Sequence, residues 1–206
     1  MENRKKVVLL VLMWCVIVFW QGTLSAEEAV IVRARIGIEL RQGMQSRPAK
    51  ARERVAVGDK FRLYAIPEPE PGYIYVVYAD KESASLLNET GQIEIPKNMP
   101  LIAPSRDKLY EFDASSPLVF ITIICSAKKL PELEPLLAQE EYPFSKWKDI
   151  EQMLIKRSEI DLSQIPLKPW PLTGTVRIHD VAFLKQLKIS SGKSLVVKTY
   201  EFRIRR

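Results

Sequence analysis

The chain contains 206 residues, of which 47% are hydrophobic and 27% are charged, and its formal net charge at pH 7 is +6. This length is sufficient for a self-supporting hydrophobic core, while the charge is too small for the basic footprint of a nucleic-acid-binding protein. One histidine and, after the first 26 residues, a single cysteine are too few for a zinc site of the usual type.

The first 26 residues have the layout of a secretory signal peptide. Three basic residues precede an unbroken apolar run from Val7 to Trp20, and small residues then lead to Ser25 and Ala26. This pattern predicts export to the periplasm or beyond, with cleavage after Ser25 or Ala26. The apolar run is shorter than the 20 or so residues of a membrane span, so an uncleaved membrane anchor is the alternative.

Residues 27–206 are predicted to form a single domain, because they contain no internal repeat and no long low-complexity linker. Loss of the signal peptide removes three basic residues and one acidic residue, which lowers the net charge from +6 to +4. Cys125 is the only cysteine left, so no intramolecular disulfide can form. Its position in an apolar segment predicts a buried, unreactive thiol.

Two strands are predicted near the start of this domain. Apolar residues occupy the even positions from Val30 to Leu40, and Phe61, Leu63 and Ala65 alternate with polar residues before Pro67. The intervening residues 41–54 carry five basic residues against one glutamate. We interpret them as a solvated basic loop, or alternatively as a surface for an anionic partner.

The middle of the chain is also rich in predicted strands. Residues 67–72 contain three prolines and predict an exposed connector. The apolar and aromatic run from Tyr73 to Ala79 predicts a central strand covered on both faces. The short segments 84–87 and 93–95 suggest a meander. Tyr73, Tyr75 and Tyr78 could instead form a platform for a ligand, although core packing is the commoner role of such residues.

The remaining chain combines strands and helices. Segments 109–112 and 118–125 predict a hairpin, while helical spacing over 130–138 and 145–157, with Ser145 as N-cap, predicts helices that cover a sheet. Residues 165–171 predict an extended connector, 181–187 a short helix and 194–204 a final strand. The predicted class is α+β, mainly antiparallel sheet, sandwich-like or meander, with two or three covering helices.

The sequence offers no convincing catalytic set. His179 beside Asp180 could act as a base in an envelope hydrolase, but there is no G-x-S-x-G nucleophile motif. Cys125 lies in a predicted buried strand, where a reactive thiolate is disfavoured. Acidic pairs at 132/134 and 140/141 fit solvated helix faces better than a glycosidase site. We predict no catalytic residues, no metal and no cofactor, and keep the His179 hydrolase as the alternative.

Several strand and turn motifs resemble those of the bacterial domain-of-unknown-function family DUF 4384. They comprise a Gly-Asp turn into a strand at 57–63, a Gly-Tyr-Ile-Tyr-Val strand within 71–80, a strand ending near Asn88 and an apolar strand ending at Ser126. The resemblance covers about residues 55–137. It implies a fold and a role as an accessory module of exported or membrane-associated proteins, and it implies no site residues.

These observations together predict an exported, non-enzymatic interaction or accessory protein of the bacterial cell envelope. Its expected partners are proteins, not nucleic acids, and contact with a membrane is expected only through an uncleaved N-terminal segment. The candidate partner-binding residues are basic side chains of the 41–54 segment and two tyrosines of the central strand: Arg47, Lys50, Arg52, Arg54, Tyr73 and Tyr75.

Overall fold

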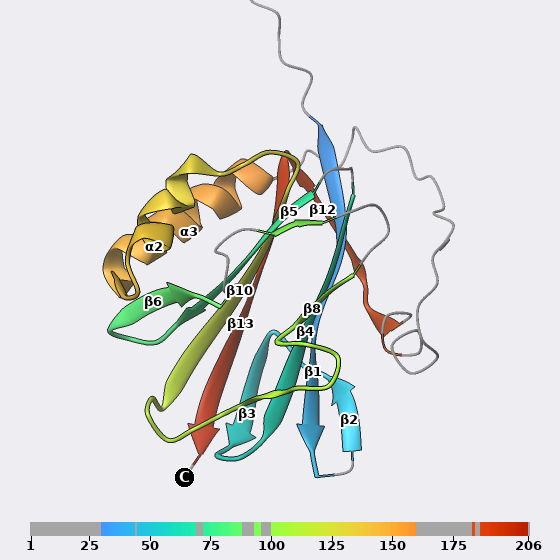
Figure 1. Cartoon of the computed structure of the whole chain (residues 1–206), viewed down its shortest axis with the longest axis vertical. Helices are drawn as coiled ribbons and strands as arrows, with labels where there is room; N and C mark the ends of the chain where they lie inside the picture. The colour runs from blue at the N-terminus through green and yellow to red at the C-terminus, as the bar shows by residue number, and fades with distance from the viewer. Residues whose placement is uncertain are drawn as a thin grey trace, which may run out of the picture.

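The computed structural model describes residues 30–43, 45–68, 72–87, 93–95, 100–159, 183 and 186–205. These residues form two β-sheets that pack face to face, with two α-helices on the outer face of one sheet (Figure 1). Strands dominate and nearly all their pairings are antiparallel. The predicted α+β class with mainly antiparallel sheet is therefore confirmed.

The first sheet has the strand order β12-β1-β4-β8, with β2 paired to β1 and β9 paired to β4. The alternation that predicted a strand near the start of the domain is confirmed in β1. Its even residues from Val32 to Leu40 are at most 1% exposed and face the second sheet. The strands are β1 (Ile31–Gln42), β2 (Gln45–Pro48), β4 (Lys60–Glu68), β8 (Leu101–Ala103), β9 (Tyr110–Glu111) and β12 (Ile189–Lys193).

The second sheet has the order β11-β6-β5-β10-β13-β3, with β7 also paired to β5. The predicted central strand is confirmed: β5 lies beside β10, and both of its faces are covered. β13 pairs with β3 in parallel and with β10 antiparallel. The strands are β3 (Arg52–Ala56), β5 (Gly72–Ala79), β6 (Ser83–Leu86), β7 (Ile93–Ile95), β10 (Leu118–Ser126), β11 (Tyr142–Pro143) and β13 (Leu195–Arg205).

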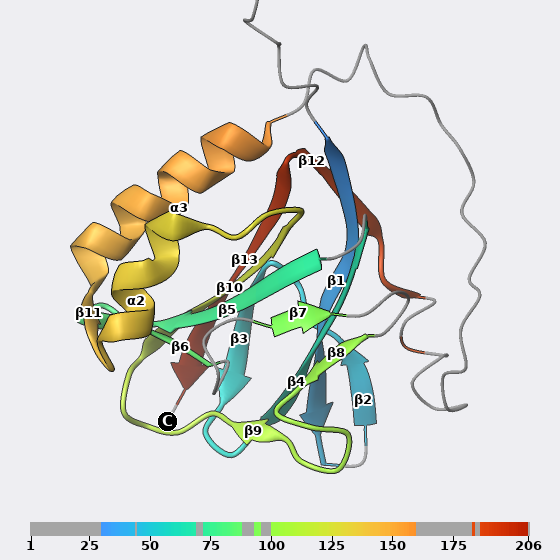
Figure 2. The same cartoon turned by 45° about the horizontal axis from the view of Figure 1, so that its top comes forward.

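The helices cover the face of the second sheet that points away from the core, as predicted (Figure 2). They are a 3-10 turn η1 (Pro131–Leu133), α2 (Glu134–Ala138) and α3 (Phe144–Ser158). Trp147 and Leu154 of α3 are fully buried against the sheet. The predicted N-cap was wrong: α3 begins at Phe144, and Pro143 is the N-cap residue without a side-chain hydrogen bond.

Three local predictions are corrected by the strand pairings. Residues 41–54 are not a loop, because β1 continues to Gln42 and the segment then forms β2 and the first part of β3. Pro67 is not in an exposed connector; it is buried within β4 beside Ala34, while residues 69–71 lie outside the described part. The predicted 109–125 hairpin does not form, because β9 pairs with β4.

The two short strands after β5 do not pair with each other as they would in a meander. β6 pairs with residues 77–79 of β5, and β7 pairs with residues 72–74 of the same strand. β6 and β7 therefore lie one after the other along the same edge of β5. The final strand is confirmed as β13, but β12 precedes it in the first sheet, so the chain passes from one sheet to the other at Ser194.

Two buried acidic side chains are fully engaged within the fold. Glu151 of α3 is 1% exposed and accepts hydrogen bonds from Thr122 (2.8 Å) and Thr199 (2.6 Å). On the outer face of the first sheet, Glu39 accepts a hydrogen bond from Tyr64 at 2.9 Å, and burial raises the pKa of Tyr64 to about 12. These hydrogen bonds offset the cost of burying the two carboxylates.

Some predictions fall outside the described residues. The signal peptide at 1–26, the connector at 165–171 and His179 all lie there, and of the predicted 181–187 helix only positions 183, 186 and 187 are described, the first two of them helical. In the described part of the chain, no helix combines the length and the hydrophobicity that crossing a membrane requires.

Candidate ligand-binding pocket

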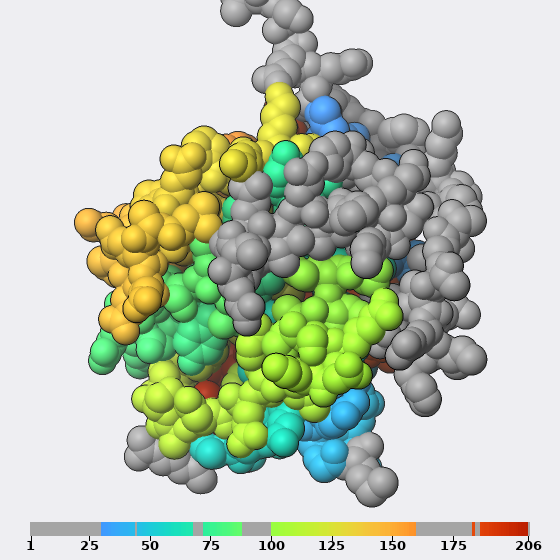
Figure 3. Space-filling model, viewed as in Figure 1, coloured from blue at the N-terminus to red at the C-terminus, as the bar shows by residue number. Residues whose placement is uncertain are grey.

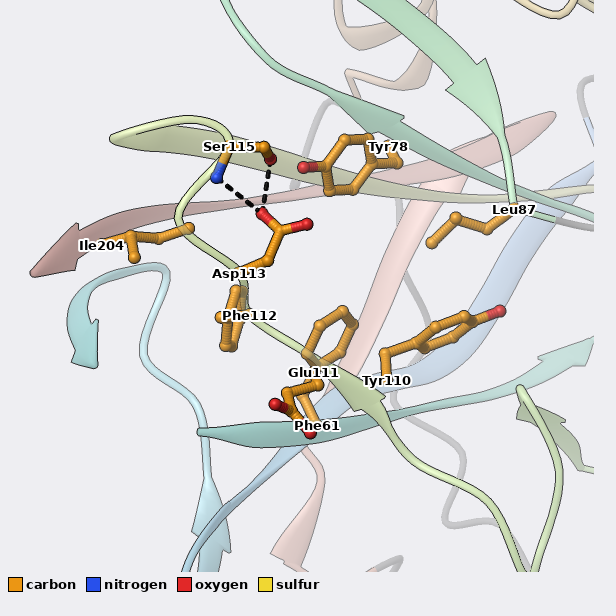
Figure 4. A pocket seen from close by; sticks show the side chains of 9 residues that line it. All are labelled: Phe61, Tyr78, Leu87, Tyr110, Glu111, Phe112, Asp113, Ser115 and Ile204. Carbon is orange, nitrogen blue, oxygen red and sulfur yellow. Dashed lines mark hydrogen bonds between the residues drawn. The ribbon is translucent and has the colours of Figure 1, made fainter. Parts of the chain in front are cut away.

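An open pocket of about 340 Å³ lies at the end of the sandwich where β13 ends (Figure 3). Both sheets contribute to it, together with the segment between β9 and β10. Figure 4 shows its lining side chains, which combine aromatic rings with two carboxylates. We call it the aromatic pocket, and it is lined by Phe61, Tyr78, Leu87, Tyr110, Glu111, Phe112, Asp113, Ser115 and Ile204.

Strand alternation directs these side chains to the pocket. Phe61 is near the start of β4 and Tyr78 near the end of β5, and each lies on the face of its strand that points into the sandwich. Phe112 is held by backbone hydrogen bonds, because its N–H donates to Asp59 (2.9 Å) and its carbonyl accepts from Gly58 (2.8 Å). The turn between β3 and β4 therefore positions the pocket wall.

The aromatic rings of the pocket continue into the hydrophobic core. The Phe61 ring centroid lies 5.2 Å from that of Tyr110 and 4.5 Å from that of Phe112, and the Phe112 centroid lies 5.0 Å from that of the fully buried Phe202. Such contacts add to the free energy of burial and restrict ring motion. The pocket wall is consequently part of the core and is formed before any ligand binds.

Asp113 supplies a negative charge at the pocket rim. Its Oδ1 accepts hydrogen bonds from the backbone N–H of Ser115 (2.9 Å) and from the Ser115 hydroxyl, and these bonds lower the pKa of Asp113. Figure 4 shows the other carboxylate oxygen directed away from Ser115, into the pocket. Asp113 is therefore ionised at neutral pH with one oxygen available to a ligand.

Tyr78 presents a neutral hydroxyl that points toward Ser115 and lies close to Asp113 (Figure 4). Burial raises its pKa, and the carboxylates of Asp113 and Asp80 raise it further. The hydroxyl therefore stays protonated at neutral pH and can donate a hydrogen bond.

Aromatic faces beside a carboxylate favour a cationic guest. An ammonium or guanidinium group gains cation–π attraction from ring faces and a charge-assisted hydrogen bond from a carboxylate. Sugar hydrolysis would instead need one carboxyl group that is shielded from water and kept protonated. Asp113 and Glu111 are both exposed, so they do not form such a pair.

The predicted basic residues lie elsewhere, along β2, β3 and their connection. Arg47 forms an ion pair with Glu53 at 2.6 Å, and Arg52 lies 3.6 Å from Glu201. Lys50 is exposed at the corner between the two sheets, and Arg54 is exposed on β3. These four residues share one edge of the sandwich and line neither this pocket nor the other one described below, and their role in partner binding stays a prediction.

The tyrosines of β5 are separated by strand alternation. Tyr75 is 1% exposed beneath the helices and its hydroxyl accepts a hydrogen bond from the Leu130 N–H at 3.0 Å, so the prediction that it contacts a partner is wrong. Tyr73 is half-buried on the same face. Tyr78 lies on the other face and is the tyrosine of this strand that reaches the aromatic pocket.

The two residues considered for nucleophilic chemistry remain apart from this site. Cys125 is fully buried in β10, which confirms the predicted buried thiol, and burial raises the pKa of this thiol, which disfavours a reactive thiolate. His179 is outside the described residues, so the hydrolase alternative stays a prediction. No cluster of potential metal ligands occurs among the described residues.

Sequence analysis did not single out Phe61, Tyr110, Phe112 or Asp113 as site residues. The alternation of aromatic and acidic residues over 110–113, followed by Ser115, was the available signal. This alternation does not by itself indicate a pocket, because the pairing of β9 with β4 is what brings these residues to the pocket.

Comparison of the chain with protein-family models, with curated proteins and with solved structures gave no match. The resemblance to DUF 4384 therefore stays a prediction.

Proposed function

We propose that the protein is an exported, non-enzymatic binding protein of the cell envelope, whose aromatic pocket holds a cationic side chain of a partner protein. The export part of the proposal is supported by the signal-peptide pattern of residues 1–26. The binding role is supported chiefly by one observation: an ionised carboxylate, Asp113, stands at a preformed wall of aromatic rings.

Arginine or lysine of a partner suits this pocket better than a wholly apolar residue. The long apolar stem of either side chain can pack against Leu87 and Ile204, while its charged end reaches the Asp113 carboxylate. Glu111, which lies 3.6 Å from Lys60, adds a second negative charge at the rim. An accessory role in a larger envelope assembly also agrees with what the DUF 4384 resemblance implies.

The proposal is tested by titrating the full chain with two short peptides that differ in one group, an arginine or its uncharged analogue citrulline. Binding is followed by the NMR shifts of the Tyr78 and Phe61 rings. We expect the arginine peptide to bind about tenfold more tightly, because the charged group contributes on the order of 1 kcal/mol or more at such a site. Asp113→Asn should remove most of this preference.

Asp149→Asn is the matched control, because Asp149 is an exposed acidic residue of α3 outside the pocket. It should leave the preference unchanged. Equal binding of the two peptides, or equal losses in the two variants, would contradict the proposal, since either result would assign the binding to overall charge or to apolar contact.

A further inference from the structure

A second pocket, of about 430 Å³, lies at the opposite end of the sandwich. β13 connects the two pockets, because Leu195 at its start lines this one and Ile204 near its end lines the aromatic pocket. Nine residues of strand span about 30 Å. We call it the basic pocket; it is lined by Val30, Ser126, Ala127, Lys128, Lys129, Leu130, Pro131, Glu132, Arg157, Lys193, Ser194 and Leu195.

Positive charge converges on this pocket from separate parts of the chain. Lys128 and Lys129 follow β10, Arg157 is in the last turn of α3, and Lys193 ends β12. Lys129 and Lys193 are exposed, and neither side chain forms an ion pair with a described residue. Among the described lining residues, Glu132 is the single acidic one.

Glu132 neutralises Arg157 only in part. One carboxylate oxygen of Glu132 accepts a hydrogen bond from Nη1 of Arg157. The other oxygen, and Nε of Arg157, are buried and have no hydrogen-bonding partner among the described residues. Since buried polar atoms normally have a partner, the wall of this pocket has an unused donor and an unused acceptor.

The pocket also has an apolar side. Val30 is 44% exposed, and the side chains of Leu130, Pro131 and Leu195 line the same space. An inorganic anion would leave this apolar surface exposed to water, whereas the carbon atoms of an ester of that anion would bury it. The combination of lysines, an arginine and aliphatic side chains thus favours a ligand with one highly charged end and one apolar or neutral part.

We propose that the basic pocket binds a phosphate ester with a net negative charge. A phosphate group has several oxygens that lysines and an arginine from different segments can contact at once, and arginine suits its geometry especially well. A hydroxyl or ammonium group on the esterified part can donate to Glu132, and its carbon atoms can cover Val30. This function is additional to the binding proposed for the aromatic pocket and does not depend on it.

The ester can be a soluble metabolite or the headgroup of an anionic phospholipid. Residues 21–29 separate the apolar run from Val30, and nine extended residues reach about 30 Å. A membrane that held the apolar run would therefore lie within reach of the basic pocket. The two sources share the same chemistry at the pocket and are distinguished by experiment.

The test uses the full chain in a non-ionic detergent and isothermal titration with glycerol 3-phosphate, inorganic phosphate, and short-chain phosphatidylglycerol or phosphatidylcholine. Exclusive binding of phosphatidylglycerol would assign the site to a lipid headgroup, and binding of glycerol 3-phosphate would assign it to soluble esters. Inorganic phosphate should bind more weakly than its ester. Binding of none of these phosphates, or equal binding of phosphatidylcholine and phosphatidylglycerol, would overturn the proposal.

Substitutions of lining residues test whether the ligand binds in the basic pocket. Replacing Lys129 and Lys193 by glutamate should weaken binding at least about tenfold, because each removes a charge-assisted contact. Glu132→Gln should strengthen it, since the repulsive charge is lost while Gln can still accept from Arg157. The control replaces Lys81 and Lys108, two exposed lysines outside this pocket, by glutamate. Equal weakening in this control would overturn the proposal, because overall charge would then explain the binding.

Discussion

The two ends of the sandwich hold pockets of opposite character. At the aromatic pocket the walls are core side chains, such as Phe61 and Phe112, that continue a chain of ring contacts into the interior. At the basic pocket the walls are residues at the ends of strands and helices and in the connections between them, and the side chains of Lys129 and Lys193 are exposed. The comparison indicates that the shape of the first is set by core packing and that of the second by backbone turns.

The backbone of the basic end is correspondingly constrained. Ser194 has a φ of 66°, which is unusual for a residue with a side chain, and it connects β12 of the first sheet to β13 of the second. Its N–H donates to the Val30 carbonyl (2.7 Å), and its carbonyl accepts from the Ala127 N–H (3.3 Å). This corner therefore joins three of the segments that line the basic pocket.

The largest expected effect is at Gly192, beside this corner. A Cβ added at Gly192 would lie 1.9 Å from the Leu195 carbonyl oxygen. Relieving this clash would require the backbone to shift, which costs free energy. Gly192→Ala should therefore lower the free energy of unfolding by about 3 kcal/mol or more, measured by urea denaturation.

Gly58→Ala at the aromatic end is the matched variant. A Cβ at Gly58 would meet no atom of the described residues within 4 Å, but the φ of +88° at this position disfavours a side chain, so we expect a loss of about 1–2 kcal/mol. Equal losses for the two glycines would show that the corner at Gly192 can relax, and the contrast between the ends would then be incorrect.

A smaller effect is expected from changing one ring of the aromatic wall. Phe112 is 3% exposed and contacts both Phe61 and Phe202, so Phe112→Leu should lower the free energy of unfolding by about 1–2 kcal/mol. Tyr110→Leu, which removes one ring contact from a half-buried position, should cost less than about 1 kcal/mol. Both losses are measured by urea denaturation. A larger loss for Tyr110→Leu than for Phe112→Leu would contradict the view that core packing sets the shape of the aromatic wall.

The sequence predicted the strands best where the apolar pattern was long and regular. β1 was identified by the alternation of apolar and polar residues, and β5 and β10 by unbroken apolar runs, because a strand with one buried face alternates while a strand covered on both faces does not. The candidate role of Tyr75 failed because both faces of β5 are covered, as the apolar run itself predicted, which leaves almost none of this side chain at the surface.

The two pockets could not be predicted from such local patterns. Phe112 reaches the aromatic pocket only because β9 pairs with β4 instead of forming a hairpin with β10. Lys129 and Lys193 are 64 positions apart, and they meet because β10 and β13 are neighbours. Strand pairing at long range depends on the packing of the whole chain, which local patterns do not encode.

The smallest expected effect distinguishes the two ends by their response to acid. Bonds from Ser115 lower the pKa of Asp113 in the folded protein, so its ionised form contributes stability above the ordinary aspartate pKa. That contribution is lost as the pH falls through the lowered pKa. Unfolding measured from neutral pH down to about pH 2 should therefore show a slightly weaker acid dependence for Asp113→Asn than for the wild type.

Asp113 is exposed, which keeps this effect on stability small, but binding at the aromatic pocket should titrate with the same group. The preference for an arginine peptide over its citrulline analogue should persist below the ordinary pKa of an aspartate and disappear only in stronger acid. Loss of the preference already near that ordinary value would mean that Ser115 does not hold the carboxylate in its ionised form. The negative charge that selects the arginine peptide would then have to come from Glu111. This residue lacks a comparable hydrogen bond among the described residues and is paired with Lys60.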